Sequence, residues 1–344
     1  MYSQSRLVVH VTRTVATAVW AISMLALSTL PASGAPIVYK GVSGRPGDPC
    51  RVMLEAFKDA LELYTNYGVR VDIYNAGTFG SQVDEAKGVR TGVPTFSLPA
   101  TNNLSLLSPS FGGALSLPYL FRSEDELYAL MKAPIWEEFQ KKLTKEAGAK
   151  ALAMGVVGFR WILNSKRPIV TVADIKGLKL RVPDVPQYIA AYKSWGVPPT
   201  PMAWNETPAA LQQGVIDGLD NAVGTHLAFK FYESAKYLTE INYALLTCPL
   251  IMGATQFEQQ PPNVRDAIVQ AAKDAQSWEY RTYKYTKQID IKALEAHGVK
   301  VNKIKGEEDL ERMARSTWPE LAARSGGSDW VKRVSEAVAN IRRQ

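Results

Sequence analysis

The sequence predicts an α/β fold, because strand-like and helix-like segments alternate along most of the chain. The chain has 344 residues, which is enough for two domains of ordinary size. Apolar residues make up 46% of the chain and charged residues 21%, as is typical of a globular protein. Alternating strands and helices favour parallel pairing, so we expect a mostly parallel or mixed sheet in each domain.

Residues 1–34 have the pattern of a secretory signal peptide: a sparsely positive start, an apolar stretch from Val15 to Leu30, and small residues up to Ala35. We expect cleavage after Gly34, since cleavage one residue later would leave Pro36 at the first mature position. The alternative is an uncleaved N-terminal anchor, for which the apolar stretch is somewhat short. The sequence has no other long apolar run, so we expect the mature protein to be exported and soluble.

The net charge of +7 does not indicate nucleic-acid binding, because no run of lysine and arginine is interleaved with aromatic residues. Export would place Cys50 and Cys248 in an oxidising compartment, where one disulfide is possible. Small buried free cysteines are also common, so the sequence leaves the bridge open. Two isolated cysteines do not indicate a metal site, and we expect no metal and no cofactor.

A strand, a glycine-bearing turn and a helix follow the signal segment. We expect the strand at Pro36–Lys40 and the helix at Asp48–Tyr67, with Asp48 as N-cap and Pro49 at the first helical position. A helix N-terminus presents free N–H groups, so this corner is a plausible place for an anion. The glycine spacing is not that of a dinucleotide-binding motif, which leaves a solute-lining loop or an ordinary tight turn.

Three polar side chains in the next part of the chain lie near the ends of predicted elements. Val69–Tyr74 alternates as a strand, and Gln82 stands at the start of the helix that follows it. Thr101 and Asn102 follow a short strand-like run that begins at Phe96. Ligands in open α/β sheets bind beyond the carboxyl ends of strands, so these residues are candidate contacts. For Gln82, a solvated position at the helix start is the alternative.

The middle of the chain contains a predicted helix and two predicted strands, and the second domain is expected to start near Gly158. A capped helix with breaks is expected over residues 123–147, and Ala149–Gly158 has the apolar pattern of a buried strand. Another short strand, Leu178–Leu180, is closed by Arg181. Pro183 should stop this strand, because proline lacks a backbone donor and restricts the residue before it.

A long helix is predicted from Asn263 to about His297, with prolines at its start and Gly298 at its end. At about 1.5 Å per residue it would span roughly 50 Å, which is longer than one domain. The alternative is two helices that break near residues 287–291. Residues 307–324 and 328–343 have the pattern of amphipathic helices, which we expect to pack on the second domain.

Arg181 is the residue whose chemistry is easiest to read from its position. A side chain at a strand end points into the crevice where α/β sheets bind ligands. The planar guanidinium group can hold a carboxylate through two parallel charge-assisted hydrogen bonds. We therefore expect Arg181 to bind an organic acid, with a structural salt bridge as the alternative.

Four short segments around Arg181 together resemble the solute receptors of TRAP transporters, of the DctP type. They occur in the family's order and with close spacing: Gly158-Phe-Arg160, Asp174 to Pro183, Pro201 to Glu206, and Ala210 to Asn221. Weaker resemblance extends from about residue 37 to the C-terminus. The resemblance implies a periplasmic protein that binds a small organic acid by hinge closure and delivers it to sodium-coupled membrane subunits.

The resemblance also implies a fold, namely a two-lobed, type II-like periplasmic binding protein with a long hinge-spanning helix. It places residues 35–157 and 246–287 in the first lobe and residues 158–245 and 288–344 in the second. Tyr237–Leu246 would return the chain across the hinge. We expect a monomer whose partners are the organic acid and the TRAP membrane subunits.

The resemblance assigns roles to individual residues. Arg181 would pair with the ligand carboxylate, Arg160 would support or orient it, and Asn221 would donate a hydrogen bond to the same carboxylate. Trp204 would pack over the ligand, unless its ring belongs to the core. With uncharged Thr101 and Asn102 nearby, Trp204 favours a monocarboxylate with a polar or ring-shaped body over a dicarboxylate. The sequence does not exclude a metal ion that bridges the ligand carboxylate and the protein.

The main alternatives are an enzyme or a sensor that acts on a small carboxylic acid with the same fold. His226 and His297 are the histidines outside the signal segment, and the sequence has no nucleophile elbow, zinc-protease or P-loop motif. Asp217 and Asp220 could form an acid and base pair, but a turn and a cleft edge explain them as well. We therefore expect a receptor with no catalytic residues.

Overall fold

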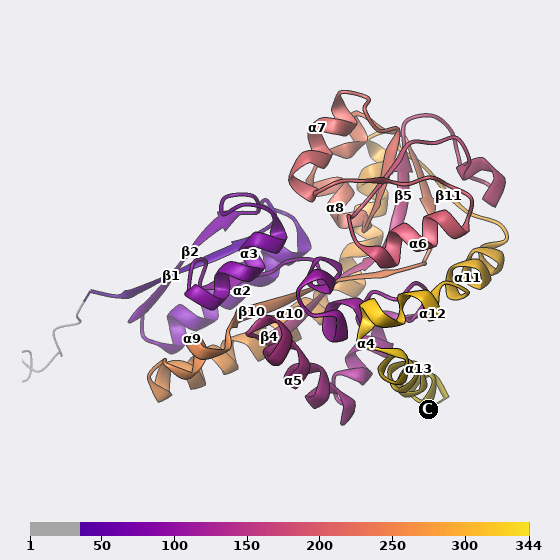
Figure 1. Cartoon of the computed structure of the whole chain (residues 1–344). Helices are drawn as coiled ribbons and strands as arrows, with labels where there is room; N and C mark the ends of the chain where they lie inside the picture. Colours follow the sequence, from indigo (N-terminus) through magenta and orange to yellow (C-terminus); the bar gives the residue numbers. More distant parts are fainter. Residues whose placement is uncertain (1–34, 344) are drawn as a thin grey trace, which may run out of the picture. The chain divides into compact units, whose positions relative to one another are not determined.

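The computed structural model describes residues 35–343, and the predicted signal peptide at residues 1–34 lies outside them. Figure 1 shows the chain from its N-terminal strands to its C-terminal helix. Within the described part of the chain, no helix is both long and apolar enough to span a bilayer. The helices lie at the following positions: α2 (Pro49–Tyr64), α3 (Gln82–Gly88), α4 (Glu124–Leu130), α5 (Ile135–Ala147), α6 (Pro186–Ser194), α7 (Thr207–Gln212), α8 (Val223–Ala228), α9 (Ala254–Glu258), α10 (Pro262–Ala296), α11 (Glu307–Arg315), α12 (Trp318–Leu321) and α13 (Ser328–Arg343).

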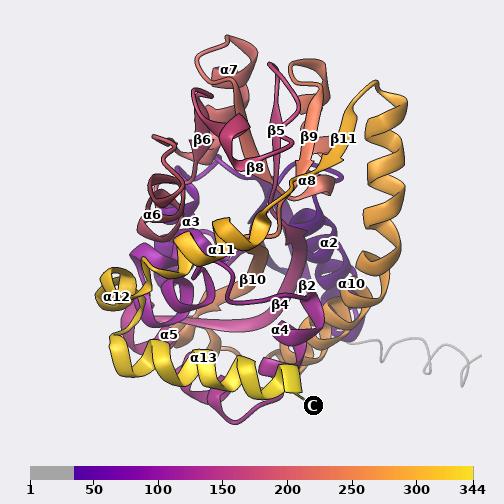
Figure 2. The same ribbon diagram turned by 90° about the vertical axis from the view of Figure 1, so that its right-hand side faces the viewer.

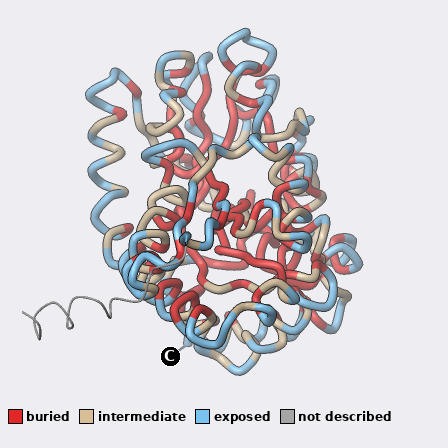
Figure 3. The backbone as a smooth tube through the Cα atoms, turned by 90° about the vertical axis from the view of Figure 1, so that its left-hand side faces the viewer, coloured by how far each residue is buried: buried red, intermediate tan, exposed pale blue. Residues whose placement is uncertain are grey.

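The strands form two separate sheets, which confirms the α/β class and the two-lobed fold. The first sheet has the order β2 (Val69–Asn75), β1 (Ile37–Ser43), β3 (Phe96–Ser97), β10 (Leu245–Gly253) and β4 (Ala149–Phe159). The second has the order β11 (Lys300–Lys303), β9 (Tyr237–Glu240), β5 (Trp161–Asn164), β8 (Gly218–Asn221), β6 (Leu180–Val182) and β7 (Thr200–Pro201). In Figure 3 the buried backbone follows the strands, and the exposed backbone lies largely on the surrounding helices and loops.

Both sheets are mixed, since each contains parallel and antiparallel pairs. β1 and β3 are parallel, whereas β10 is antiparallel to both β3 and β4. In the second sheet β5 is antiparallel to β8 and β9, while β6 is parallel to β7 and β8. The antiparallel pairs involve the strands that carry the chain from one sheet to the other, and the sheets are of the mixed kind that the sequence predicts.

The chain crosses between the sheets at two adjacent places. Arg160 is the single residue between β4 of the first sheet and β5 of the second. The return crossing lies between β9 and β10, at residues 241–244. The Arg160 backbone N–H donates to the Ala244 carbonyl at 3.0 Å, which ties the two crossings together.

Helix α10 is continuous from Pro262 to Ala296, which confirms the single long helix and excludes the predicted break near residue 287. It packs against β4 of the first sheet and the neighbouring helix α2. It also packs against β11 of the second sheet and the helix α8. Its run alongside both sheets is visible in Figure 2. One continuous helix therefore contacts both lobes.

Glu279 of α10 is a buried carboxyl group whose ionisation should oppose folding. Its side chain accepts a hydrogen bond from the Tyr128 hydroxyl at 2.8 Å, and the residue is only 5% exposed. Burial raises the pKa of Glu279 from 4.5 to about 7. Between these values the folded protein holds a proton that the unfolded chain has lost, so this group's stabilising contribution falls as pH rises.

We expect Glu279→Gln to gain stability relative to the parent as pH rises, by about 2–3 kcal/mol between pH 5 and pH 8, because glutamine does not titrate. Urea unfolding at the two pH values measures this difference. Glu295→Gln, an exposed site on the same helix, is the matched control and should follow the parent. A Glu279→Gln difference that stays constant with pH would show that the carboxyl group ionises normally.

The two C-terminal helical segments pack on different parts of the protein. α11 contacts α6 of the second lobe, as expected. α13 instead packs against α4, and Arg342 forms an ion pair with Glu126 at 2.7 Å. Trp330 meets Phe139 of α5 edge to face, with ring centroids 4.8 Å apart. The expectation that residues 328–343 pack on the second domain is therefore wrong, because an apolar stripe does not specify which surface it covers.

The start of α2 is held by two interactions. Asp48 is the N-cap, and its Oδ1 accepts a hydrogen bond from the Cys50 backbone N–H at 3.0 Å, as predicted. Cys50 forms a disulfide with Cys248 of β10, with Cα atoms 6.0 Å apart. The bridge that the sequence left open thus links the start of α2 to the strand that follows the return crossing.

Candidate functional site

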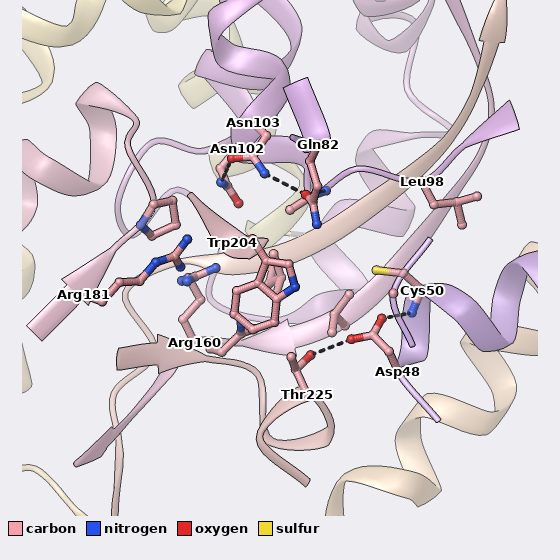
Figure 4. Close-up of a pocket in the computed structure, with 16 residues that line it drawn as sticks. Asp48, Cys50, Gln82, Leu98, Asn102, Asn103, Arg160, Arg181, Trp204 and Thr225 are labelled. Carbon is pink, nitrogen blue, oxygen red and sulfur yellow. Dashed lines mark hydrogen bonds between the residues drawn. The ribbon is translucent and has the colours of Figure 1, made fainter. Parts of the chain in front are cut away.

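A pocket lies where residues of both sheets meet, close to the two crossings. Its cavity volume is about 50 Å³, within a hollow of about 510 Å³ that includes space open to solvent. Six of the seven predicted site residues line it: Gln82, Asn102, Arg160, Arg181, Trp204 and Asn221. Figure 4 shows both arginines directed toward its interior. The remaining lining residues are Gly44, Asp48, Cys50, Leu98, Ala100, Asn103, Val157, Pro183, Thr225 and Leu246.

Arg160 lines the pocket, but its charge is already matched. Its Nε donates to Asp220 Oδ2 at 2.7 Å, and its Nη2 donates to the Asp220 carbonyl at 2.7 Å. The Tyr243 hydroxyl donates to the same carboxylate. Burial disfavours the charged guanidinium, but the Asp220 carboxylate outweighs burial and raises the pKa of Arg160. Arg160 is thus locked in place, with its remaining N–H groups available to the pocket.

Arg181 is buried, at 3% exposure, without such a partner. Its hydrogen bonds within the described part of the chain both go to the Met202 carbonyl, from Nε at 3.1 Å and Nη2 at 2.7 Å. Burial and then the charge of Arg160 lower the pKa of Arg181 to about 9, so it is still protonated at neutral pH. A buried cation that only a carbonyl accompanies is a site for an anion.

The local structure around Arg181 differs slightly from the prediction. β6 is Leu180–Val182, so Arg181 lies in the middle of the strand and does not close it. The strand ends directly before Pro183, as predicted. Arg181 pairs with Leu219 of β8 and Thr200 of β7, so strands on both sides fix its backbone.

Asn221 and Trp204 complete the second-sheet wall of the pocket. The Asn221 side-chain oxygen accepts from the Ala222 backbone N–H at 2.8 Å, which leaves its amide nitrogen as the group to meet a ligand. The Trp204 ring packs edge to face on Phe229 at 4.8 Å, and the Arg181 guanidinium lies 5.5 Å from its centroid. Trp204 therefore combines both predicted roles, since it packs on the core and lines the pocket.

An amide chain forms part of the opposite wall. The Asn102 amide donates to Asn103 Oδ1 at 3.0 Å, and the Asn103 amide donates to Gln82 Oε1 at 2.7 Å. Gln82 Oε1 also accepts from the Ala100 backbone N–H at 3.0 Å. Gln82 is therefore not simply a solvated residue at a helix start, because it holds the wall that presents Asn102.

Thr101 does not reach the pocket. Its hydroxyl points into the first lobe and shares a hydrogen bond of 2.6 Å with the Thr247 hydroxyl. Residues 101–106 form a 3₁₀ helix after β3, so consecutive side chains point in different directions. Sequence alone placed Thr101 and Asn102 together at a strand end, and this helical turn separates them.

Asp48, Asn103 and Thr225 line the pocket without having been predicted as contacts. Asp48 Oδ2 accepts a hydrogen bond from the Thr225 hydroxyl at 3.3 Å, in addition to capping α2. Burial raises the pKa of Asp48 to about 6, although the Cys50 N–H bond opposes this. The signal in the sequence was the glycine-rich turn before Asp48, which marks a corner open to a ligand.

The suggested acid and base pair does not face the pocket. Asp220 is paired with Arg160, whereas Asp217 accepts from the Lys179 backbone N–H at 2.9 Å and pairs with Lys166 at 3.3 Å. Neither residue lines the cavity. Within residues 35–343, no group of three or more His, Cys, Asp or Glu side chains is arranged to hold a metal ion.

Comparison with known families matches residues 42–324 to the bacterial extracellular solute-binding proteins of family 7, DctP. The chain belongs to this family. The resemblance of the motifs around Arg181 to DctP proteins is thereby confirmed. The chain is also similar to the 2,3-diketo-L-gulonate-binding periplasmic protein YiaO of Escherichia coli, 28% identical over 269 residues that cover 78% of this chain and 80% of the relative.

Solved structures of solute-binding proteins share the fold. A TRAP periplasmic solute-binding protein from Rhodobacter sphaeroides, solved in an apo open state, is 30% identical with a TM-score of 0.74, covering 88% of this chain and 99% of that one. The sugar acid binding protein DctPAm from Advenella mimigardefordensis, in complex with galactonate, is 25% identical with a TM-score of 0.83, covering 89% and 98%.

Proposed function

We propose that this protein is the periplasmic receptor of a TRAP transporter and that it binds a small organic acid through Arg181. The observation that carries the proposal is a buried cation in a pocket, accompanied by a backbone carbonyl and not by a carboxylate. A ligand carboxylate would supply the missing charge and accept two parallel hydrogen bonds. The Asn221 amide nitrogen would donate a third.

Arg160 acts in this proposal as a positioning residue. Its ion pair with Asp220 balances its charge and holds it in the pocket with Arg181. Its remaining N–H groups donate hydrogen bonds to the ligand carboxylate. Trp204 packs over the body of the ligand.

Binding is coupled to closure of the lobes. We propose residues 35–157 and 246–287 as one lobe and residues 158–245 and 288–315 as the other. The second lobe was expected to extend to residue 344, but α13 packs against α4 of the first lobe. The ligand contacts both walls, so it binds the closed state more tightly and shifts the population toward it.

The ligand class we favour is a hydroxylated or sugar-like acid. Support comes from the polar amide wall at Asn102, from the sugar acid binding protein solved with galactonate, and from the relative named for 2,3-diketo-L-gulonate. The closed complex would then dock on the TRAP membrane subunits as a monomer, after export directed by residues 1–34. No cofactor enters this mechanism.

The proposal is tested by thermal unfolding of residues 35–344 against a panel of sugar acids, hydroxy acids, keto acids and dicarboxylates. An acid at a hundred times its dissociation constant adds about 2.7 kcal/mol, which shifts Tm by several degrees. We expect at least one acid to stabilise the parent, and Arg181→Ala to lose the shift.

Arg312→Ala is the matched control, because Arg312 is an exposed arginine of α11 that does not line the pocket. It should respond as the parent does. Protein unfolded and refolded before the screen removes ligand that co-purified. If no acid then shifts the parent, or if Arg181→Ala retains the shift, the carboxylate-receptor function is wrong.

A further inference from the structure

Hydrogen-bond donors are concentrated on one wall of the pocket. Arg181 and Arg160 present guanidinium N–H groups, and Asn221 presents its amide nitrogen, because its oxygen is bound to the Ala222 N–H. All three residues belong to the second sheet or to the crossing that enters it. This wall suits a carboxylate.

The other wall carries acceptors. Asn102 is 2% exposed, and its Oδ1 has no hydrogen-bond partner among residues 35–343, although its amide nitrogen is bound to Asn103. The Asp48 carboxylate is 6% exposed and accepts from the Cys50 N–H and the Thr225 hydroxyl. Each carboxylate oxygen can accept two hydrogen bonds, so Asp48 retains capacity for a ligand donor.

The pocket has one cation available for a ligand carboxylate and not two. Asp220 neutralises Arg160, so Arg181 is the cation left for a ligand. In Figure 4 Asp48 lies on the opposite side of Trp204 from Arg181. A ligand held by Arg181 that reached Asp48 with a second carboxylate would place two like charges together in a buried site, which is costly.

We propose that Asp48 and Asn102 determine specificity: they accept hydrogen bonds from hydroxyl groups at the far end of the acid, and Asp48 excludes acids that carry a second carboxylate there. This inference rests on the proposed function, because it assumes that Arg181 holds the first carboxylate. The selected class is the polyhydroxy monocarboxylate.

Galactonate and galactarate are a suitable probe pair, because they differ only at the end far from the first carboxylate. Galactonate has a hydroxymethyl group there, and galactarate has a second carboxylate. Calorimetry should show that the parent prefers galactonate at least tenfold. Asp48→Asn keeps an oxygen to cap α2 but removes the charge. We expect it to reduce the preference at least tenfold, mainly through tighter binding of galactarate. A folding defect would not improve binding of any acid.

Two further variants complete the experiment. Asn102→Leu has a similar size without an acceptor and should weaken galactonate binding about tenfold, the effect of one lost hydrogen bond in a buried site. Asp174→Asn makes the same chemical change in a half-buried capping box outside the pocket, where Asp174 accepts from the Thr171 backbone N–H, and it should leave both affinities unchanged.

The outcomes separate this inference from the proposed function. If the panel contains another monocarboxylate that binds more tightly than galactonate, that acid and its analogue with a second terminal carboxylate form the probe pair. Suppose that binding depends on Arg181. Equal affinity for both members of the pair, or a ratio of the two affinities that Asp48→Asn does not change, would then overturn only this inference. Binding that is absent or independent of Arg181 overturns both.

Discussion

Arg181→Lys is expected to weaken binding of the organic acid about a hundredfold, which corresponds to about 2.7 kcal/mol. The guanidinium of Arg181 is oriented by two hydrogen bonds to the Met202 carbonyl, so its outer N–H groups face the pocket as a planar fork. A lysine ammonium group preserves the charge but cannot make the two parallel bonds. It would also remove the two guanidinium N–H groups that the Met202 carbonyl accepts from.

Isothermal titration of the parent, Arg181→Lys and Arg181→Ala with the acid identified by the panel measures this effect. Urea unfolding of the free proteins serves as the control, because a buried arginine without a carboxylate partner contributes little to stability and its loss should not destabilise the fold. A lysine variant that binds as tightly as the parent would show that charge alone, and not the fork, holds the ligand.

Asp220→Asn is expected to lower the free energy of unfolding by about 3–5 kcal/mol, because it leaves the buried charge of Arg160 without its partner. The Asp220 side chain is fully buried and is the shared acceptor of Arg160 and Tyr243. Asparagine keeps the shape and one acceptor oxygen, so the loss reports mainly on charge. Urea unfolding at pH 7 measures it.

The double variant Arg160→Gln/Asp220→Asn provides the matched comparison. Removing both charges eliminates the uncompensated ion, so the double variant should recover part of the stability that Asp220→Asn loses. Tyr243→Phe, which removes one donor to the same carboxylate, should have a smaller effect. A loss below about 1 kcal/mol in Asp220→Asn would mean that water reaches Arg160 and replaces the carboxylate.

Local signals in the sequence predicted local structure well. Asp48 with Pro49 marked the start of α2, Pro183 marked the end of β6, and the prolines before Asn263 began a helix that proved continuous. Each of these signals acts through the backbone of a few neighbouring residues, so distant contacts do not change it. The family motifs predicted residues that do line one pocket with Arg181. The spacing within each motif reflects the local strands, turns and helices that carry these residues.

Features that depend on distant partners could not be predicted in the same way. The pairing of Arg160 with Asp220 requires β5 and β8 to be neighbours, which no local pattern specifies. The disulfide of Cys50 joins residues 198 positions apart. Asp48 looked like a simple cap because its second contact, Thr225, comes from the other lobe.

The single-residue crossing at Arg160 has a consequence for any attempt to change which acid the protein takes up. Arg160 is the only position between β4 and β5, and its side chain also faces the ligand pocket. A substitution there would alter affinity and the freedom of the lobes to rotate together, so neither effect could be tuned separately. Asn102 and Gln82 belong to neither crossing, so new solute preferences are best engineered, or acquired in evolution, from that wall.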